Sequence, residues 1–158
     1  YKYYDLLAKR YNYNHLAYYK LGEYYFNGTG VVKDINKAFH YYLYASNKLS
    51  YRALGIMFMD GEVVEQDVEL AIFNLLNAFR LGDNFSLILL AVLYSDKKSK
   101  YYSKARSDEC LTQFFKNTKW NEELQNEIIS ALDFVDDDIK KKFNEYMDKY
   151  WNRKAMQA

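Results

Sequence analysis

The glycines Gly28 and Gly30, in the stretch "NGTG", are the first residues whose types and spacing suggest chemistry. Glycine-rich loops bind phosphate through backbone N–H groups, but a P-loop continues into Gly-Lys-Ser/Thr at the start of a helix. Here Val31 and Val32 follow, and the sequence repeats the position as "DGEV" 33 residues later. We therefore interpret "NGTG" as a recurring turn and not as a nucleotide site.

The histidines, the cysteine and the clustered carboxylates form no catalytic or metal-binding set. His15 and His40 have no cysteines or carboxylates at the spacing of metal ligands. Cys110 lies in no nucleophile motif and is expected to be a small packed side chain. Asp136, Asp137 and Asp138 are interpreted as the start of a helix. We expect no enzyme, no bound metal and no cofactor within this chain.

The stretch "KKSKYYSKAR", residues 97–106, is the best candidate for binding a polyanion. Basic side chains can contact phosphates while aromatic rings stack on bases. A solvated loop between helices has the same composition, and the whole chain carries 22 basic against 21 acidic residues. This balance gives no general attraction to nucleic acid or to an anionic membrane, so nucleic acid is disfavoured as a partner. An RNA-binding helical repeat remains the alternative function, and it would act through Lys97, Lys98, Lys100, Lys104 and Arg106.

The bulk composition predicts one helical domain. The 158 residues are half apolar and include no proline, so helices are permitted almost anywhere. The longest apolar run, Leu87 to Tyr94, is too short to span a membrane. The single cysteine excludes an internal disulfide framework. Because the sequence opens at Tyr1 with no methionine or signal peptide, we expect a fragment of a longer protein.

An internal repeat organises most of the chain. A shift of 33 residues superposes one set of small, apolar and turn positions on another. A shift of 36 begins a third copy at Leu90, in which Ala91 and Lys97 replace the glycines. Ala8 marks the end of an earlier unit. The repeated positions are Leu21, Gly22, Tyr25, Gly28, Val31, Asp34, Ala38 and Ala45, followed by Leu54, Gly55, Phe58, Gly61, Val64, Asp67, Ala71 and Ala78.

Each repeat is predicted to be a helix, a turn and a second helix. Gly28 is placed to end the first helix in a left-handed conformation, and Asp34 and Asp67 stand where an N-cap residue belongs. Small residues such as Gly22 and Gly55 would let the paired helices approach closely. Since one such pair cannot bury its apolar face alone, neighbouring pairs are expected to stack.

The pattern Leu-Gly-x-x-Tyr/Phe-x-x-Gly, followed by Val, Asp, Ala and a final Ala, resembles the Sel-1-like repeat, a relative of the tetratricopeptide repeat. The second copy departs from it at Val63, where a turn glycine belongs, and at Asn74, an aromatic position. The resemblance implies an all-α, right-handed solenoid. It is strong over residues 1–96 and weak over 97–117. We expect repeats over residues 1–117: a partial repeat at 1–14, two repeats at about 15–47 and 48–81, and a degenerate one at 82–117.

Residues 118–158 are predicted to form C-terminal capping helices, or a partner-binding extension. One helical face carries Leu124, Ile128, Leu132 and Val135, and a second carries Ile139, Phe143, Tyr146, Met147 and Tyr150.

The resemblance also implies that the first helix of each repeat lines a concave groove. The outward side of these helices changes from aromatic and polar to apolar along the chain, which suits a partner helix or an extended peptide. Alternatively, the C-terminal helices fill the apolar half of the groove. The predicted groove residues are Tyr19, Glu23, Phe26, Arg52, Ile56, Met59, Ile88 and Val92.

The function expected from this architecture is a non-catalytic scaffold or adaptor for protein–protein recognition. Proteins with such repeats include an adaptor of the endoplasmic-reticulum degradation ubiquitin ligase. The sequons at Asn27 and Asn84 and the richness in tyrosine, asparagine and lysine favour that role and the endoplasmic-reticulum lumen. The cytoplasm is the alternative compartment. A regulatory module of a larger enzyme, with its catalytic domain elsewhere, is another alternative.

Overall fold

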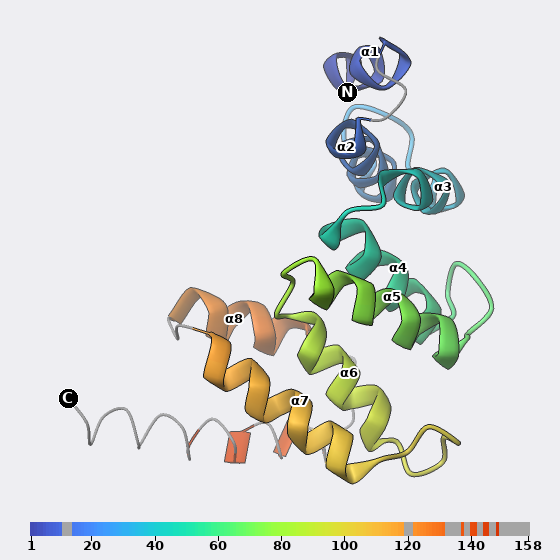
Figure 1. Ribbon diagram of the computed structural model, residues 1–158. Coiled ribbons are helices and arrows are strands. Elements are labelled where there is room, and N and C mark those ends of the chain that lie inside the picture. Colours follow the sequence, from blue (N-terminus) through green and yellow to red (C-terminus); the bar gives the residue numbers. More distant parts are fainter. Residues whose placement is uncertain are drawn as a thin grey trace. The chain divides into compact units, whose positions relative to one another are not determined.

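The chain folds into α-helices that follow one another as helix–turn–helix pairs in a computed structural model (Figure 1). The structure describes residues 1–10, 14–118 and 122–131, and the single residues 137, 140, 141, 144, 145 and 148. Over this part of the chain all regular structure is helical, which confirms the predicted all-α class. The chain divides into two units, residues 1–86 and 87–158, which are described separately below.

The described part of unit 1 contains five helices, and two helix pairs form its body. Helix α2 packs against α3 and α4 packs against α5, while α1 contacts α2 and α3 contacts α4. The turns that connect the partners of each pair are short, as expected for neighbouring helices. The helices are α1 (Lys2–Arg10), α2 (His15–Asn27), α3 (Ile35–Ala45), α4 (Lys48–Asp60) and α5 (Val68–Arg80).

The second helix of each pair begins at the predicted aspartate. The Oδ1 atom of Asp34 accepts a hydrogen bond from the backbone N–H of Lys37 at 3.0 Å, and Oδ1 of Asp67 accepts one from Leu70 at 3.0 Å. Each carboxylate thereby satisfies one of the N–H groups that a helix start leaves without an intrahelical acceptor. Both N-cap predictions are confirmed.

The first helix of each pair ends at the predicted glycine. Gly28 has a φ of 72° and Gly61 a φ of 71°, in the left-handed region that other residues rarely adopt. The N–H of Gly28 donates to the carbonyl of Tyr24 at 2.8 Å, and the N–H of Gly61 donates to that of Met57 at 3.2 Å. These C-caps confirm that "NGTG" and "DGEV" are corresponding turns.

Glycine also sets the distance between the paired helices. A Cβ atom on Gly22 would lie 2.5 Å from Cε1 of Tyr42, and one on Gly55 would lie 2.6 Å from Cγ of Leu75. Real Cβ contacts are never this short, so a side chain at either position would displace its neighbour. Tyr42 and Leu75 are themselves buried, which makes such a displacement costly.

Tyrosines form the seam between α1, α2 and α3. The rings of Tyr25 and Tyr41 stack with centroids 5.5 Å apart, and Tyr1 meets Tyr25 edge-on at 6.0 Å. The hydroxyls of Tyr1 and Tyr25 are hydrogen-bonded at 3.2 Å. This hydrogen bond, with burial, raises the pKa of Tyr1 to about 12. The abundance of tyrosine near the start of the chain thus has a packing role.

Unit 2 opens with a third helix pair, α6 (Ser86–Ser95) and α7 (Lys104–Asn117), followed by α8 (Glu122–Ala131). Ser103 caps α7 by accepting from the N–H of Arg106 at 3.3 Å. The Oγ atom of Ser107 donates to the carbonyl of Ala91 at 2.9 Å and joins the two helices. The weak resemblance over 97–117 therefore understated the structure, because serines do there what aspartate and alanine do in the first two repeats.

The first part of α6 is buried around its circumference. Leu87, Ile88, Leu89, Leu90 and Ala91 are each at most 2 % exposed, as the continuous apolar run predicts. In α8, Ile128 is buried as expected of the predicted apolar face. Leu132, Val135, Ile139, Phe143, Tyr146, Met147 and Tyr150 lie outside the described residues, as does the side chain of Leu124.

Candidate functional site

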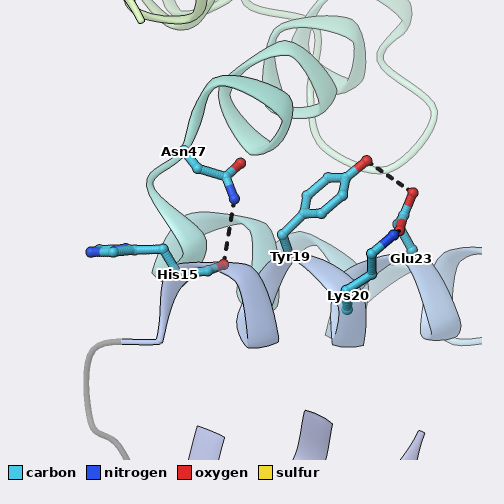
Figure 2. Close-up of polar contacts among 5 residues, drawn as sticks. All are labelled: His15, Tyr19, Lys20, Glu23 and Asn47. Carbon is cyan, nitrogen blue, oxygen red and sulfur yellow. Dashed lines mark hydrogen bonds and ion pairs between the residues drawn. The ribbon is translucent and has the colours of Figure 1, made fainter. Parts of the chain in front are cut away.

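The predicted groove residues of α2 form a linked polar group next to an exposed ring. The hydroxyl of Tyr19 donates to Oε1 of Glu23 at 2.9 Å, and Nζ of Lys20 donates to Oε2 of the same carboxylate at 2.7 Å. Figure 2 shows these three side chains on the side of α2 where Asn47 and the start of α4 lie. Phe26, one turn beyond Glu23, is 41 % exposed.

The hydroxyl of Tyr19 is held as a hydrogen-bond donor. Its ring packs against Tyr42, with centroids 5.8 Å apart. Burial, followed by the hydrogen bond to Glu23, raises the pKa of Tyr19 well above its usual value. The side chain therefore stays neutral at physiological pH and keeps the carboxylate of Glu23 in place. Both oxygens of that carboxylate are engaged, so its charge is partly satisfied within the chain.

The predicted groove residue Arg52 is paired with the carboxylate of Asp83, which was not among the predicted site residues. Its Nη1 atom donates to Oδ1 of Asp83 at 3.2 Å, and the Asp83 side chain is 8 % exposed. The guanidinium lies 5.1 Å from the ring centre of Phe85. Oδ2 of Asp83 accepts from Oγ of Ser86 at 2.6 Å, at the start of α6. Since Arg52 and Asp83 both contribute to the electrostatic environment of Tyr19, the two polar groups lie near one another.

The other predicted groove residues differ in exposure. Ile56 is half-buried, whereas Met59 is 8 % exposed. In unit 2, Val92 is half-buried and Ile88 is 2 % exposed. Met59 and Ile88 therefore offer a partner little surface. Periodicity alone did not reveal this, because α6 is apolar on every side.

The repeat signature residues lie where their types can be used. Leu21, Ala38, Ala45, Leu54, Ala71 and Ala78 are buried in unit 1. Asn74, which departs from the aromatic pattern, donates through Nδ2 to the carbonyl of Leu70 at 2.8 Å. Val63 packs against the cluster that contains Leu54. Both departures thus have defined contacts within the repeat.

Three residues that precede helices were missed, although the register of the repeat could have found them. Asn14 accepts from the N–H of Ala17 at 3.0 Å, and Asn47 accepts from that of Ser50 at 2.8 Å. Asp83 occupies the corresponding position before α6. The shifts of 33 and 36 residues that align the glycines also align Asn14, Asn47 and Asp83, so a prediction that followed the shift through the turns would have included the two caps and drawn attention to Asp83.

The candidate catalytic side chains have structural contacts. Nδ1 of His15 lies 2.6 Å from the carbonyl oxygen of Ala45; because a carbonyl only accepts, this nitrogen is the donor. His40 is exposed and meets the ring of Phe39 edge-on. Burial raises the pKa of Cys110 to about 11, so the thiol is protonated at neutral pH.

Over the residues that the structure describes, no group of three or more His, Cys, Asp and Glu side chains is arranged to hold a metal ion. Within the same part of the chain, no helix is both long enough and apolar enough to cross a membrane.

Comparison with known proteins identifies the repeats. The family model described as the Sel1 repeat matches residues 15–48 and 49–83. The first range contains α2 and α3, and the second contains α4 and α5. Each of the two matched ranges is therefore similar to a Sel1 repeat. No curated protein is significantly similar to it in sequence.

Solved structures with Sel1 repeats share the fold. A Sel1 repeat protein from Oxalobacter formigenes is similar with a TM-score of 0.65 and 22% identity, over 74% of this chain and 49% of that one. A protective antigen of uropathogenic Escherichia coli strains, which displays the same repeat fold, is similar with a TM-score of 0.61 and 21% identity, over 66% of this chain and 23% of the antigen. The chain thus spans half or less of these relatives. At such identities the likeness concerns the fold alone.

Sel1 repeat proteins generally act as scaffolds for protein–protein interactions, and their fold is of a non-catalytic type.

Proposed function

We propose that this chain is a non-catalytic scaffold that binds a partner protein through the outward side of α2 and α4. This interaction face consists of Tyr19, Glu23, Phe26, Arg52 and Ile56, whereas Met59, although predicted for the groove, is 8 % exposed and offers little surface. The partner contributes a helix or an extended peptide. Ile88 and Val92 remain predictions for unit 2.

One observation supports this proposal: the two repeats keep their framework and change their surface. The close contact of Gly22 with Tyr42 recurs between Gly55 and Leu75, and the cap of Asp34 recurs at Asp67. The outward positions share nothing, since Tyr19 and Glu23 are followed at the same spacing by Arg52 and Ile56. A rigid frame with a variable face is the usual arrangement of repeat proteins that recognise other proteins.

The chemistry of the face suits a protein partner better than a small anion. Glu23 is engaged by Tyr19 and Lys20, and Arg52 is engaged by Asp83. The charges are therefore paired already, next to the exposed ring of Phe26 and the half-buried Ile56. Paired charges around apolar side chains resemble the composition of a protein–protein interface. Because the frame is preformed, little conformational entropy is lost on docking.

Photo-crosslinking tests the proposal. A benzophenone amino acid replaces Phe26 in one variant and Ile56 in another, in the intact protein inside cells. Phe73 of α5, which is 58 % exposed, is the matched control. We expect both face variants to capture the same protein and the Phe73 variant to capture little of it. Capture of residues 118–158 of the same chain would contradict the proposal, because the tail would then cover the face. Equal capture at Phe73 would contradict it as well.

The finer role, as a subunit of an endoplasmic-reticulum degradation ubiquitin ligase complex, stays a prediction that the comparisons do not support. Its support is the sequon at Asn27, which is exposed at the end of α2, whereas Asn84 is half-buried. Expression of the intact protein in its own cells, followed by endoglycosidase treatment, tests the compartment. A mobility shift that disappears in Asn27→Gln is expected of a luminal protein. An unshifted wild-type protein contradicts this placement.

A further inference from the structure

The turn between α6 and α7, together with the first turn of α7, carries exposed positive charge that the interaction face does not use. We call residues 96–106 the basic turn. Its cations Lys97, Lys98, Lys100, Lys104 and Arg106 are all exposed. Its one carboxylate, Asp96, accepts from the backbone N–H of Lys98 at 2.9 Å and so belongs to the turn itself.

The fold does not require this charge. Lys97 and Lys100 occupy the positions of Gly61 and Val64 in the second repeat, where Gly61 ends a helix and Val64 packs against the core. The second turn carries the opposite charge, with Asp60, Glu62, Glu65 and Asp67 and no cation over residues 60–67. Successive repeats thus close their turns equally well with acidic and with basic residues.

Two of the cations oppose local stability. Lys104 and Arg106 lie in the first turn of α7, which has no acidic residue. Positive charge is unfavourable at the positive end of a helix dipole. Lys97, Lys98 and Lys104 pair with no carboxylate among the residues that the structure describes. Lysines that do not pair, one of them at a helix start that its charge weakens, indicate selection for something outside the fold.

The aromatic residues of the basic turn decide between two kinds of polyanion. Nζ of Lys100 lies 5.0 Å from the ring centre of Tyr101. The guanidinium of Arg106 lies 5.6 Å from the ring centre of Tyr94, which is buried. Among the rings of the described turn, Tyr102 is the exposed one, at 43 %. A single-stranded nucleic acid needs several open ring faces for stacking, whereas carboxylates need the cations alone.

We propose that the basic turn docks an acidic, Asp- and Glu-rich segment of a partner protein. The inference rests on the proposed function in that the partner is a protein. It places a second contact in unit 2, separate in sequence and chemistry from the interaction face. The expected binding is electrostatic, so it weakens as salt rises.

Fluorescence anisotropy with a labelled peptide tests the proposal on the full chain. The probe is a Glu-rich peptide, its Gln-rich counterpart is the negative control, and a single-stranded RNA of equal charge is the competing probe. The variant Lys97→Glu, Lys98→Glu, Lys104→Glu removes the patch. Its matched control, Lys2→Glu, Lys33→Glu, Lys48→Glu, changes the net charge equally at exposed positions of unit 1. Circular dichroism confirms that both variants fold.

We expect the Glu-rich peptide to bind at low salt and the patch variant to bind it roughly tenfold more weakly, since exposed charge contacts contribute modestly each. The control variant shows whether the loss of binding comes from the net charge of the chain or from these lysines. The Gln-rich peptide shows whether binding requires carboxylates. Equal weakening in both variants would overturn the proposal. So would an absence of peptide binding, or tighter binding of the RNA than of the peptide. Because the crosslinks at Phe26 and Ile56 do not involve these lysines, failure here leaves the interaction face to be judged by its own experiment.

Discussion

The first two repeats and the third close the same backbone contact with different residues. The N–H of Asp34 donates to the carbonyl of Tyr25 at 2.9 Å, that of Asp67 donates to Phe58 at 3.0 Å, and that of Ser103 donates to Tyr94 at 2.8 Å. The first two turns use left-handed glycines, and the third has Lys97 instead. Each repeat therefore keeps two features: the N-cap residue of its second helix, and the hydrogen bond from the backbone N–H of that residue to a carbonyl of the first helix. A left-handed glycine in the turn is not required for either.

Substitutions at the position that sets the spacing between paired helices should give the largest difference in stability between the first two repeats and the third. Gly55→Leu places a side chain against Leu75, where a Cβ alone would lie 2.6 Å from Cγ. We expect a loss of about 3 kcal/mol in the free energy of unfolding, measured in urea. In the third repeat Ala91 already occupies this position, so Ala91→Gly should cost about 1 kcal/mol from helix propensity alone. Equal losses would show that the spacing is not set by the glycine.

The turn glycines provide the next largest contrast. Gly61→Ala forces an L-residue to a φ of 71° and brings its Cβ to 3.0 Å from Cβ of Gln66. The expected cost is about 1–2 kcal/mol in the free energy of unfolding. Lys97→Ala at the corresponding position should be near neutral, because Ser46 is the one described non-glycine residue with a positive φ. A similar cost at both positions, measured by thermal unfolding, would refute the distinction.

The caps should be interchangeable between the repeats. Asp67→Ala and Ser103→Ala each remove the acceptor for one N–H of the following helix. Each should therefore cost about 1 kcal/mol. Ser103→Asp should retain the stability, or increase it, because a carboxylate is favourable at the positive end of α7. An unfolding midpoint that Ser103→Ala leaves unchanged would show that Ser103 does not act as Asp67 does.

The smallest expected effect on stability concerns a position at which each repeat has a different residue. Tyr41 and Asn74 are followed at the corresponding place by Cys110. Because burial, and then Glu109, raise the pKa of its thiol from 9.0 to about 11, the thiolate at pH 8 is roughly 100-fold scarcer than in an unfolded chain. Alkylation by iodoacetamide should be slow in the native protein and fast in urea. The folded state favours the protonated thiol, so stability is retained below pH 9 and falls as the pH rises toward 11. Equal alkylation rates in both states would contradict the burial of this side chain.

The sequence predicted what depends on local chemistry. Gly28 and Gly61 as helix ends, and Asp34 and Asp67 as caps, follow from residue type and spacing, and the structure confirms all four. Ser103 was missed because a cap requires only a short side-chain oxygen, so no single residue type marks it.

The contacts of the candidate site were less accessible to prediction. Periodicity assigns Arg52 to the outward side of α4, but its pairing with Asp83 joins residues 31 apart and depends on how the helices approach. Ile88 was assigned to the same side, although the first part of α6 is buried all round and its periodicity defines no outward direction.

The close contacts of each repeat have a consequence for synthesis. Gly22 meets Tyr42, and Ser107 reaches Ala91 only 16 residues back. Chains dominated by such short-range contacts fold fast, since little loop entropy opposes closure. Each helix pair therefore contains the partners it needs as soon as its second helix has left the ribosome. The chain should acquire its structure from the N-terminus onward, one pair at a time, while translation continues.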